Sequence, residues 1–66
     1  LSMSLMNKRE ATGLSIVELS NRIASLYNTK LSPELIERIE SKQTKLKNED
    51  AQILAEFFNT TSEDLM

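Results

Sequence analysis

Cysteine, histidine and tryptophan are all absent from this chain of 66 residues. Without cysteine, no disulfide can staple the fold and no thiolate can bind a metal. Without histidine, the chain lacks the most common general base and the most common transition-metal ligand. A glycine-rich phosphate loop is missing too, so we expect a protein that is not an enzyme and needs no metal or other cofactor.

Residues that break helices are also scarce, because Gly13 and Pro33 are the only glycine and the only proline. Apolar residues recur at helical spacing, and no alternating pattern is long enough to predict a strand. Apolar runs are far shorter than a membrane span or a signal-peptide core requires. We therefore expect a single all-α domain over residues 1–66, located in the cytoplasm, with residues 1–4 as a candidate cloning remnant.

The net charge of −2 is awkward for a nucleic-acid binder, because lysine and arginine supply most of the non-specific affinity for phosphates. The charges are unevenly distributed, however. Lys42, Lys45 and Lys47 fall within six positions, and the chain beyond them carries five acidic residues. This pattern indicates a local basic edge on an acidic protein.

Capping signals predict where the first two helices begin and end. The first is expected over Ser4–Ala11, and Gly13 suits its C-terminal end. The second begins after Ser15 as N-cap, with Glu18 completing a capping box, and extends to Tyr27. The apolar side of the first helix consists of Met3, Leu5 and Met6, and that of the second of Ile16, Leu19, Ile23, Leu26 and Tyr27.

Three further helices follow the same logic. Ser32 caps the third, with Pro33 at its first position, where a missing N–H costs nothing. A polar connection over Ser41–Lys47 leads to a fourth helix, which is expected from about Asn48 as N-cap to Phe58. Thr61 caps a short last helix, with Asp64 at a box-like spacing and Leu65 pointing inward.

Several blocks then carry a family resemblance: Gly13-Leu14-Ser15, Val17–Ser20, Leu31-Ser32, Ile36 with Ile39-Glu40, and Leu54–Leu65. In their order and spacing they resemble the helix-turn-helix domains of bacterial and phage repressors similar to the lambda and 434 repressors and Cro. The resemblance covers about 50 of the 66 residues. It implies a compact five-helix domain that binds double-stranded DNA sequence-specifically, as a homodimer, and regulates transcription, most often as a repressor.

The chain departs from this family in three ways. About six extra residues lie between Ile23 and Leu31, which implies a longer second helix or a wider turn. Lys42 replaces the glycine usual after the third helix, and Leu46 replaces a proline usual before the fourth. The exposed face of the third helix is also acidic.

The resemblance places the third helix, residues 33–41, in the major groove. Its positions for base or nearby phosphate contacts are Pro33, Glu34, Glu37 and Arg38. Arginine can bond guanine in bidentate fashion, and a carboxylate can accept from cytosine N4. The alternative is a solvated helix face with weak side-chain pairs.

The resemblance also implies residues that contact phosphates and residues that stabilise the fold. The phosphate-contacting candidates are Ser15, Lys30, Lys42, Thr44, Lys45 and Lys47, although Ser15 is more surely an N-cap and the loop could be an ordinary soluble one. Arg9 and Glu40 occupy positions where family members often place a partly buried ion pair. The segment Ala24–Lys30 either reaches the DNA backbone or extends the core, and core packing is favoured for Leu26.

An alternative hypothesis is that the domain binds a protein rather than DNA. The acidic third helix and the net charge suit a helix-turn-helix scaffold that binds a protein, such as an antitoxin or a regulatory adaptor. The candidate surface for a homodimer is the exposed part of Phe57, Phe58, Leu65 and Met66. The carboxylate pairs do not form an organised calcium loop, so no metal site is expected.

Overall fold

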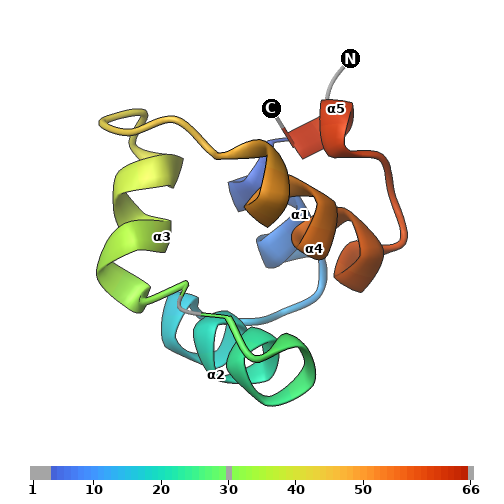
Figure 1. Cartoon of the computed structure of the whole chain (residues 1–66). Coiled ribbons are helices and arrows are strands. Elements are labelled where there is room, and N and C mark those ends of the chain that lie inside the picture. Colours follow the sequence, from blue (N-terminus) through green and yellow to red (C-terminus); the bar gives the residue numbers. More distant parts are fainter. Residues whose placement is uncertain (1–3, 30, 66) are drawn as a thin grey trace.

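The computed structural model describes residues 4–29 and 31–65, and all regular secondary structure within these ranges is α-helical. The prediction of an all-α fold with five helices is therefore confirmed. Figure 1 shows the helices, which are α1 (Leu5–Ala11), α2 (Ile16–Tyr27), α3 (Pro33–Glu40), α4 (Asn48–Phe58) and α5 (Ser62–Leu65). Across the described part of the chain, no helix has the length and apolar character needed to cross a bilayer.

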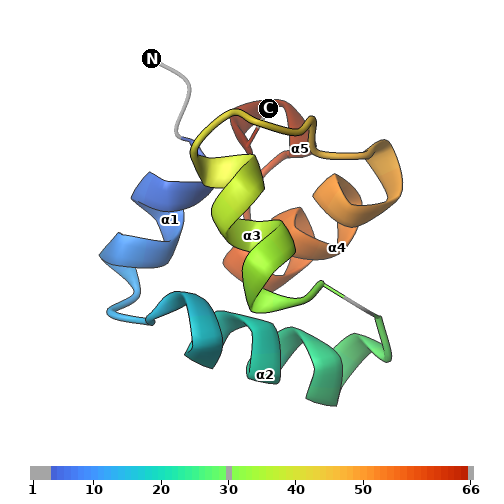
Figure 2. The same cartoon turned by 90° about the vertical axis from the view of Figure 1, so that its left-hand side faces the viewer.

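The helices enclose one small core with α3 at its edge. Helix α5 packs on α4 and touches α1, whereas α2 packs on both α3 and α4. Figure 2 shows α2 running beneath α3, with α3 standing across it in front of the other helices. One side of α3 is therefore turned inward and the other is left facing outward.

Four large side chains from three helices are completely shielded from solvent. Leu19 and Ile23 come from α2, Ile36 from α3 and Leu54 from α4. Burying side chains of this size is worth about 1.5–3 kcal/mol each, so they hold α2, α3 and α4 together. The remaining buried apolar residues are Leu5, Leu31, Leu46, Ala51, Ala55 and Leu65.

Serine N-caps explain where α1, α2 and α3 begin. Ser4 accepts a hydrogen bond from the Asn7 N–H, so Ser4 caps α1 rather than opening it. Ser15 and Ser32 cap α2 and α3, as expected, and Pro33 opens α3. A hydroxyl at each N-cap satisfies one amide that the helix itself cannot.

Left-handed residues follow four of the helices. Gly13 (φ +77°), Asn28 (φ +52°), Lys42 (φ +65°) and Asn59 (φ +56°) follow α1, α2, α3 and α4. At α3, the Gln43 N–H bonds the Arg38 carbonyl at 2.9 Å and the Lys42 N–H bonds the Ile39 carbonyl at 3.1 Å. Such a paired closure satisfies carbonyls that would otherwise be left open at the helix end.

Two predictions of apolar packing were wrong. Leu26 is 63% exposed and Met6 is 38% exposed, so neither belongs to the core. Both helices turn these side chains outward, because the buried positions are taken by Ile23 and Leu5. Tyr27 is half-buried against the core and Met3 lies outside the described residues.

Two capping predictions also need correction. Helix α4 already includes Asn48, and its N-cap is Lys47, which makes no side-chain capping bond. At α5, Thr61 does accept from the Asp64 N–H at 3.3 Å. The Asp64 carboxylate, however, accepts from the Thr60 hydroxyl at 2.7 Å instead of closing a box on Thr61.

Candidate nucleic-acid interface

Helix α3 presents a polar face to solvent. Ile36 is buried and Leu35 and Ile39 are packed against the core, which fixes how the helix is rotated. Residues three and four positions apart share a helix face, so the opposite side carries Glu34, Glu37 and Arg38. All three are exposed, and Pro33 is half-buried at the start of the same helix. The candidate base-reading side chains therefore share one exposed face of α3.

The connection between α3 and α4 is tied down by one apolar side chain. Leu46 is only 7% exposed and belongs to the core, so the loop is anchored just before α4 begins. The polar residues around Leu46 are exposed, namely Lys42, Gln43, Thr44, Lys45 and Lys47. An anchored loop therefore carries three exposed lysines between the C-terminal end of α3 and the N-terminus of α4.

Two of these lysines occupy positions where another residue type would make the fold more stable. Lys42 adopts a left-handed backbone, which costs a residue with a side chain about 1–2 kcal/mol. Lys47 is an N-cap without a capping bond, and a cation there opposes the helix dipole. Local rules are most often broken at functional positions, so these two lysines are candidates for a role beyond folding.

The charged residues on the exposed face of α3 form no salt bridges with other described residues. Among the described residues the Arg9–Glu40 pair is the one salt bridge, so Glu34, Glu37 and Arg38 form none there. The chain after Lys47 contains five acidic and no basic residues. The molecule therefore has a mixed, basic-edged region at α3 and its loop, and an acidic region at α4 and α5.

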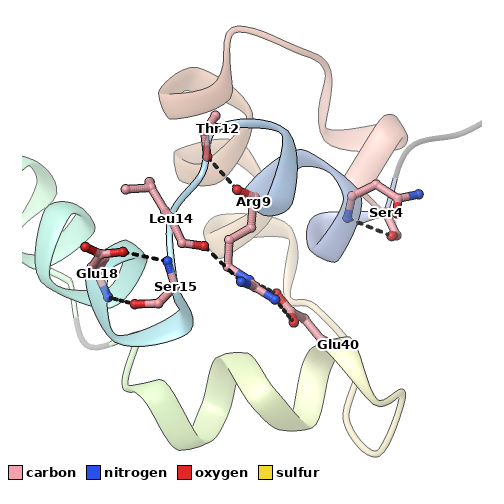
Figure 3. A network of polar contacts seen from close by, with 8 residues as sticks. Ser4, Arg9, Thr12, Leu14, Ser15, Glu18 and Glu40 are labelled. Carbon is pink, nitrogen blue, oxygen red and sulfur yellow. Dashed lines mark hydrogen bonds and ion pairs between the residues drawn. The ribbon is translucent and has the colours of Figure 1, made fainter.

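Arg9 ties three segments together beside this region. Its Nε and Nη2 donate to the two carboxylate oxygens of Glu40 at 2.7 and 2.9 Å, and its Nη1 donates to the Leu14 carbonyl at 2.9 Å. The side chains of Arg9 and Glu40 are 12% and 3% exposed. The hydrogen bonding of Arg9 to the Glu40 carboxylate raises the pKa of Arg9 above its ordinary value. Figure 3 shows the guanidinium joining α1, the α1–α2 connection and the end of α3.

Ser20 makes a second tie that the sequence did not reveal. Its hydroxyl is buried and donates to the Leu31 carbonyl at 2.6 Å, which links α2 to the residue two before α3. The available signal was positional, because Ser20 lies four residues after Ile16 and three before Ile23 on the apolar side of α2. Together the two ties hold both ends of α3.

The start of α2 is organised as a capping box, visible in Figure 3. Ser15 Oγ accepts from the Glu18 N–H at 3.0 Å, and the Ser15 N–H donates to the Glu18 carboxylate at 2.8 Å. Those bonds with Ser15 lower the pKa of Glu18. A carboxylate already occupies this helix end, so Ser15 is a poor phosphate ligand on physical grounds. Lys30, the other candidate next to α3, lies outside the described residues.

Comparisons with models of known protein families, with curated proteins and with solved structures give no match. Within residues 4–29 and 31–65, no group of three or more acidic side chains is placed to hold a metal ion. The basis for a function is therefore the geometry and charge of the described residues.

Proposed function

We propose that the chain is a helix-turn-helix domain, similar in plan to the lambda repressor family, that binds double-stranded DNA sequence-specifically. Helix α3 enters the major groove with Glu34, Glu37 and Arg38 toward the base edges. The loop after α3 holds the phosphate backbone through Lys42, Lys45 and Lys47. In this proposal the domain regulates transcription in the cytoplasm, most simply by repression.

The observation that carries the proposal is that Lys42, just after the end of α3, and Lys47, at the N-terminus of α4, stand near the two ends of the exposed connection that follows α3. Each lysine costs folding stability where it stands, yet each is exposed and belongs to the cluster of three lysines between residues 42 and 47. Phosphate contacts from such a loop orient a protein on the duplex, and base contacts then supply the sequence preference. The ties made by Arg9 and Ser20 would keep α3 rigid during docking.

Two copies are expected on the DNA, because one small domain buries limited surface and specific affinity usually requires a second half-site. The dimer surface suggested by the sequence is smaller than expected. Leu65 is buried, at 5% exposure, in agreement with its predicted inward orientation, and Met66 lies outside the described residues. Phe57 and Phe58 are half-buried and meet edge to face at 5.0 Å between ring centres. The partly exposed edges of these two rings remain the candidate contact.

The test is a binding selection from random duplex DNA, performed with the wild-type chain and Arg38→Ala, each as the free chain and as a forced dimer. Salt concentrations of about 50 mM and about 200 mM separate sequence reading from simple charge attraction. Recovery of a palindromic consensus that Arg38→Ala loses would support the proposal. No enrichment by the free chain or the forced dimer, at either salt concentration, would refute it.

The protein-binding scaffold remains the second candidate, because Glu34 and Glu37 are both exposed on the face that would meet phosphates. If that candidate holds, α3 would dock on a cationic protein partner and the duplex selection would return nothing. The two functions therefore predict opposite results in the same experiment.

A further inference from the structure

We propose that Glu34 is a specificity-determining residue that accepts a hydrogen bond from the amino group of cytosine in the major groove. This inference rests on the proposed function. Glu34 stands in the first turn of α3, directly after Pro33, and its side chain is exposed. The N-terminal residues of a recognition helix are the ones that reach base edges.

The chemistry of a carboxylate limits which bases it can meet. An ionised carboxylate only accepts hydrogen bonds. Guanine and thymine present acceptor oxygens in the major groove, whereas cytosine N4 and adenine N6 present donors. Adenine also places its N7 acceptor beside N6, and that lone pair repels a neighbouring carboxylate. Cytosine is therefore the base that suits Glu34 best.

The fold itself makes little use of this carboxylate. The N-cap of α3 is Ser32, whose Oγ accepts from the Leu35 N–H at 3.2 Å. Among the described residues, Glu34 forms no salt bridge and accepts no side-chain hydrogen bond. Its carboxylate can therefore turn to an outside donor without disturbing the protein.

Repulsion adds to the selectivity of this face. A duplex without a suitably placed amino group leaves Glu34 and Glu37 desolvated near phosphates, which lowers the affinity for that duplex. Glutamates on the reading face thus weaken binding to unrelated DNA and favour binding to the cognate site. The lysines of the adjacent loop act equally on every sequence and cannot provide this discrimination.

Arg38 extends the expected recognition pattern by one helical turn. Residues four apart on a helix are separated by about 6 Å along its axis. That separation corresponds to roughly two base-pair steps at about 3.4 Å each. Arginine bonds guanine O6 and N7 in bidentate fashion. The half-site should therefore contain a cytosine and, about two steps away on either strand, a guanine.

The chain offers a closely matched control in Glu49. Glu34 and Glu49 are both the second residue of their helices, α3 and α4, and both are exposed. Neutralising either one removes the same charge from the same kind of helix position. Only Glu34 lies on the face of α3 that would enter the groove.

The experiment is a selection from random duplexes with the wild-type chain, Glu34→Gln and Glu49→Gln, after thermal melting has shown that all three fold. Glutamine bonds adenine N6 and N7, so Glu34→Gln should change one cytosine of the consensus to adenine. The preference at that position should shift by on the order of 10-fold to 100-fold, and Glu49→Gln should leave the consensus unchanged. Affinity for a scrambled duplex should rise severalfold for Glu34→Gln relative to Glu49→Gln.

The outcomes separate this inference from the proposed function. A wild-type consensus that Glu34→Gln leaves unaltered would overturn the role of Glu34 while DNA binding stands. A consensus whose only conserved G·C pair is the one that Arg38→Ala loses would do the same. The absence of any consensus for the wild-type chain would overturn both.

Discussion

Arg9 in α1 and Glu40 at the end of α3 are 31 positions apart in the chain and share two hydrogen bonds of 2.7 and 2.9 Å. A bidentate pair of this kind fixes both distance and angle between the helices that carry it. Because Glu40 stands two residues before Lys42, the pair also positions the start of the α3–α4 loop. The rigidity of the candidate interface therefore depends on a contact made behind it.

Arg9→Ala should lower the free energy of unfolding by about 2–4 kcal/mol, because it leaves the nearly buried Glu40 carboxylate without its partner. The double variant Arg9→Met with Glu40→Leu should lose much less, since no charge is then left buried. Thermal or urea unfolding followed by circular dichroism measures both. Arg22→Ala, at an exposed site on α2, is the control and should change stability little. A melting temperature of Arg9→Ala equal to that of the control would contradict the prediction.

Local signals in the sequence were sufficient to predict the helices and most of their caps. Ser15 with Glu18, and Ser32 with Pro33, act within four residues, so their outcome does not depend on the rest of the fold. The fourth N-cap was misplaced by one residue because Asn48 is a better cap than Lys47 by intrinsic preference. There the anchored loop before α4 overrides local preference.

Tertiary features were harder to predict. Leu26 is exposed because no other described helix covers its side of α2, and periodicity alone does not reveal which neighbours a helix has. The Arg9–Glu40 pair was expected only through the family resemblance, because a separation of 31 residues carries no local signal. The open face of α3 could be predicted, since it follows from the burial of Ile36 and Ile39 on the other side.

Ser20→Ala should destabilise the fold by about 1–2 kcal/mol, because the buried Leu31 carbonyl loses the hydroxyl that bonds it. Ser25→Ala is a control on the same helix, since Ser25 is exposed and alanine is the better helix former. Chemical unfolding should therefore move the two variants in opposite directions. Equal midpoints for both would show that the Ser20 hydroxyl contributes nothing.

Glu18 should make the stability of α2 depend on pH in the acidic range. Its folded pKa is lowered from 4.5, chiefly by the Ser15 N–H, so its contribution is present above about pH 4.5 and is lost as pH falls through the lower folded pKa. Glu18→Gln should melt below the wild type at neutral pH, and the gap should close in acid once Glu18 is protonated. Melting curves across this range measure the gap, and a constant gap would argue against the assignment.

Lys42→Gly should separate stability from DNA binding. Glycine adopts the left-handed conformation of residue 42 without steric cost. The free energy of unfolding of the variant should therefore be about 1 kcal/mol higher than that of the wild type. The same change removes a proposed phosphate contact and should weaken binding to the selected duplex. Asn59→Gly is the control, because asparagine already tolerates this conformation and should gain less. If Lys42→Gly binds the duplex as tightly as the wild type, Lys42 is not a phosphate contact.

Lys45→Gln should reduce the salt dependence of binding without changing the consensus. Each phosphate contact contributes about −0.9 to the slope of log affinity against log salt, so three lysines per protomer give roughly −2.7. Losing Lys45 should make the slope shallower by about 0.9 per protomer, since its charge is exposed and the fold does not depend on it. Lys8→Gln in α1 removes the same charge away from α3 and should leave the slope as it is. Titrations of the duplex at four or more salt concentrations measure this slope. Equal slopes for both variants would show that the α3–α4 loop is not part of the interface.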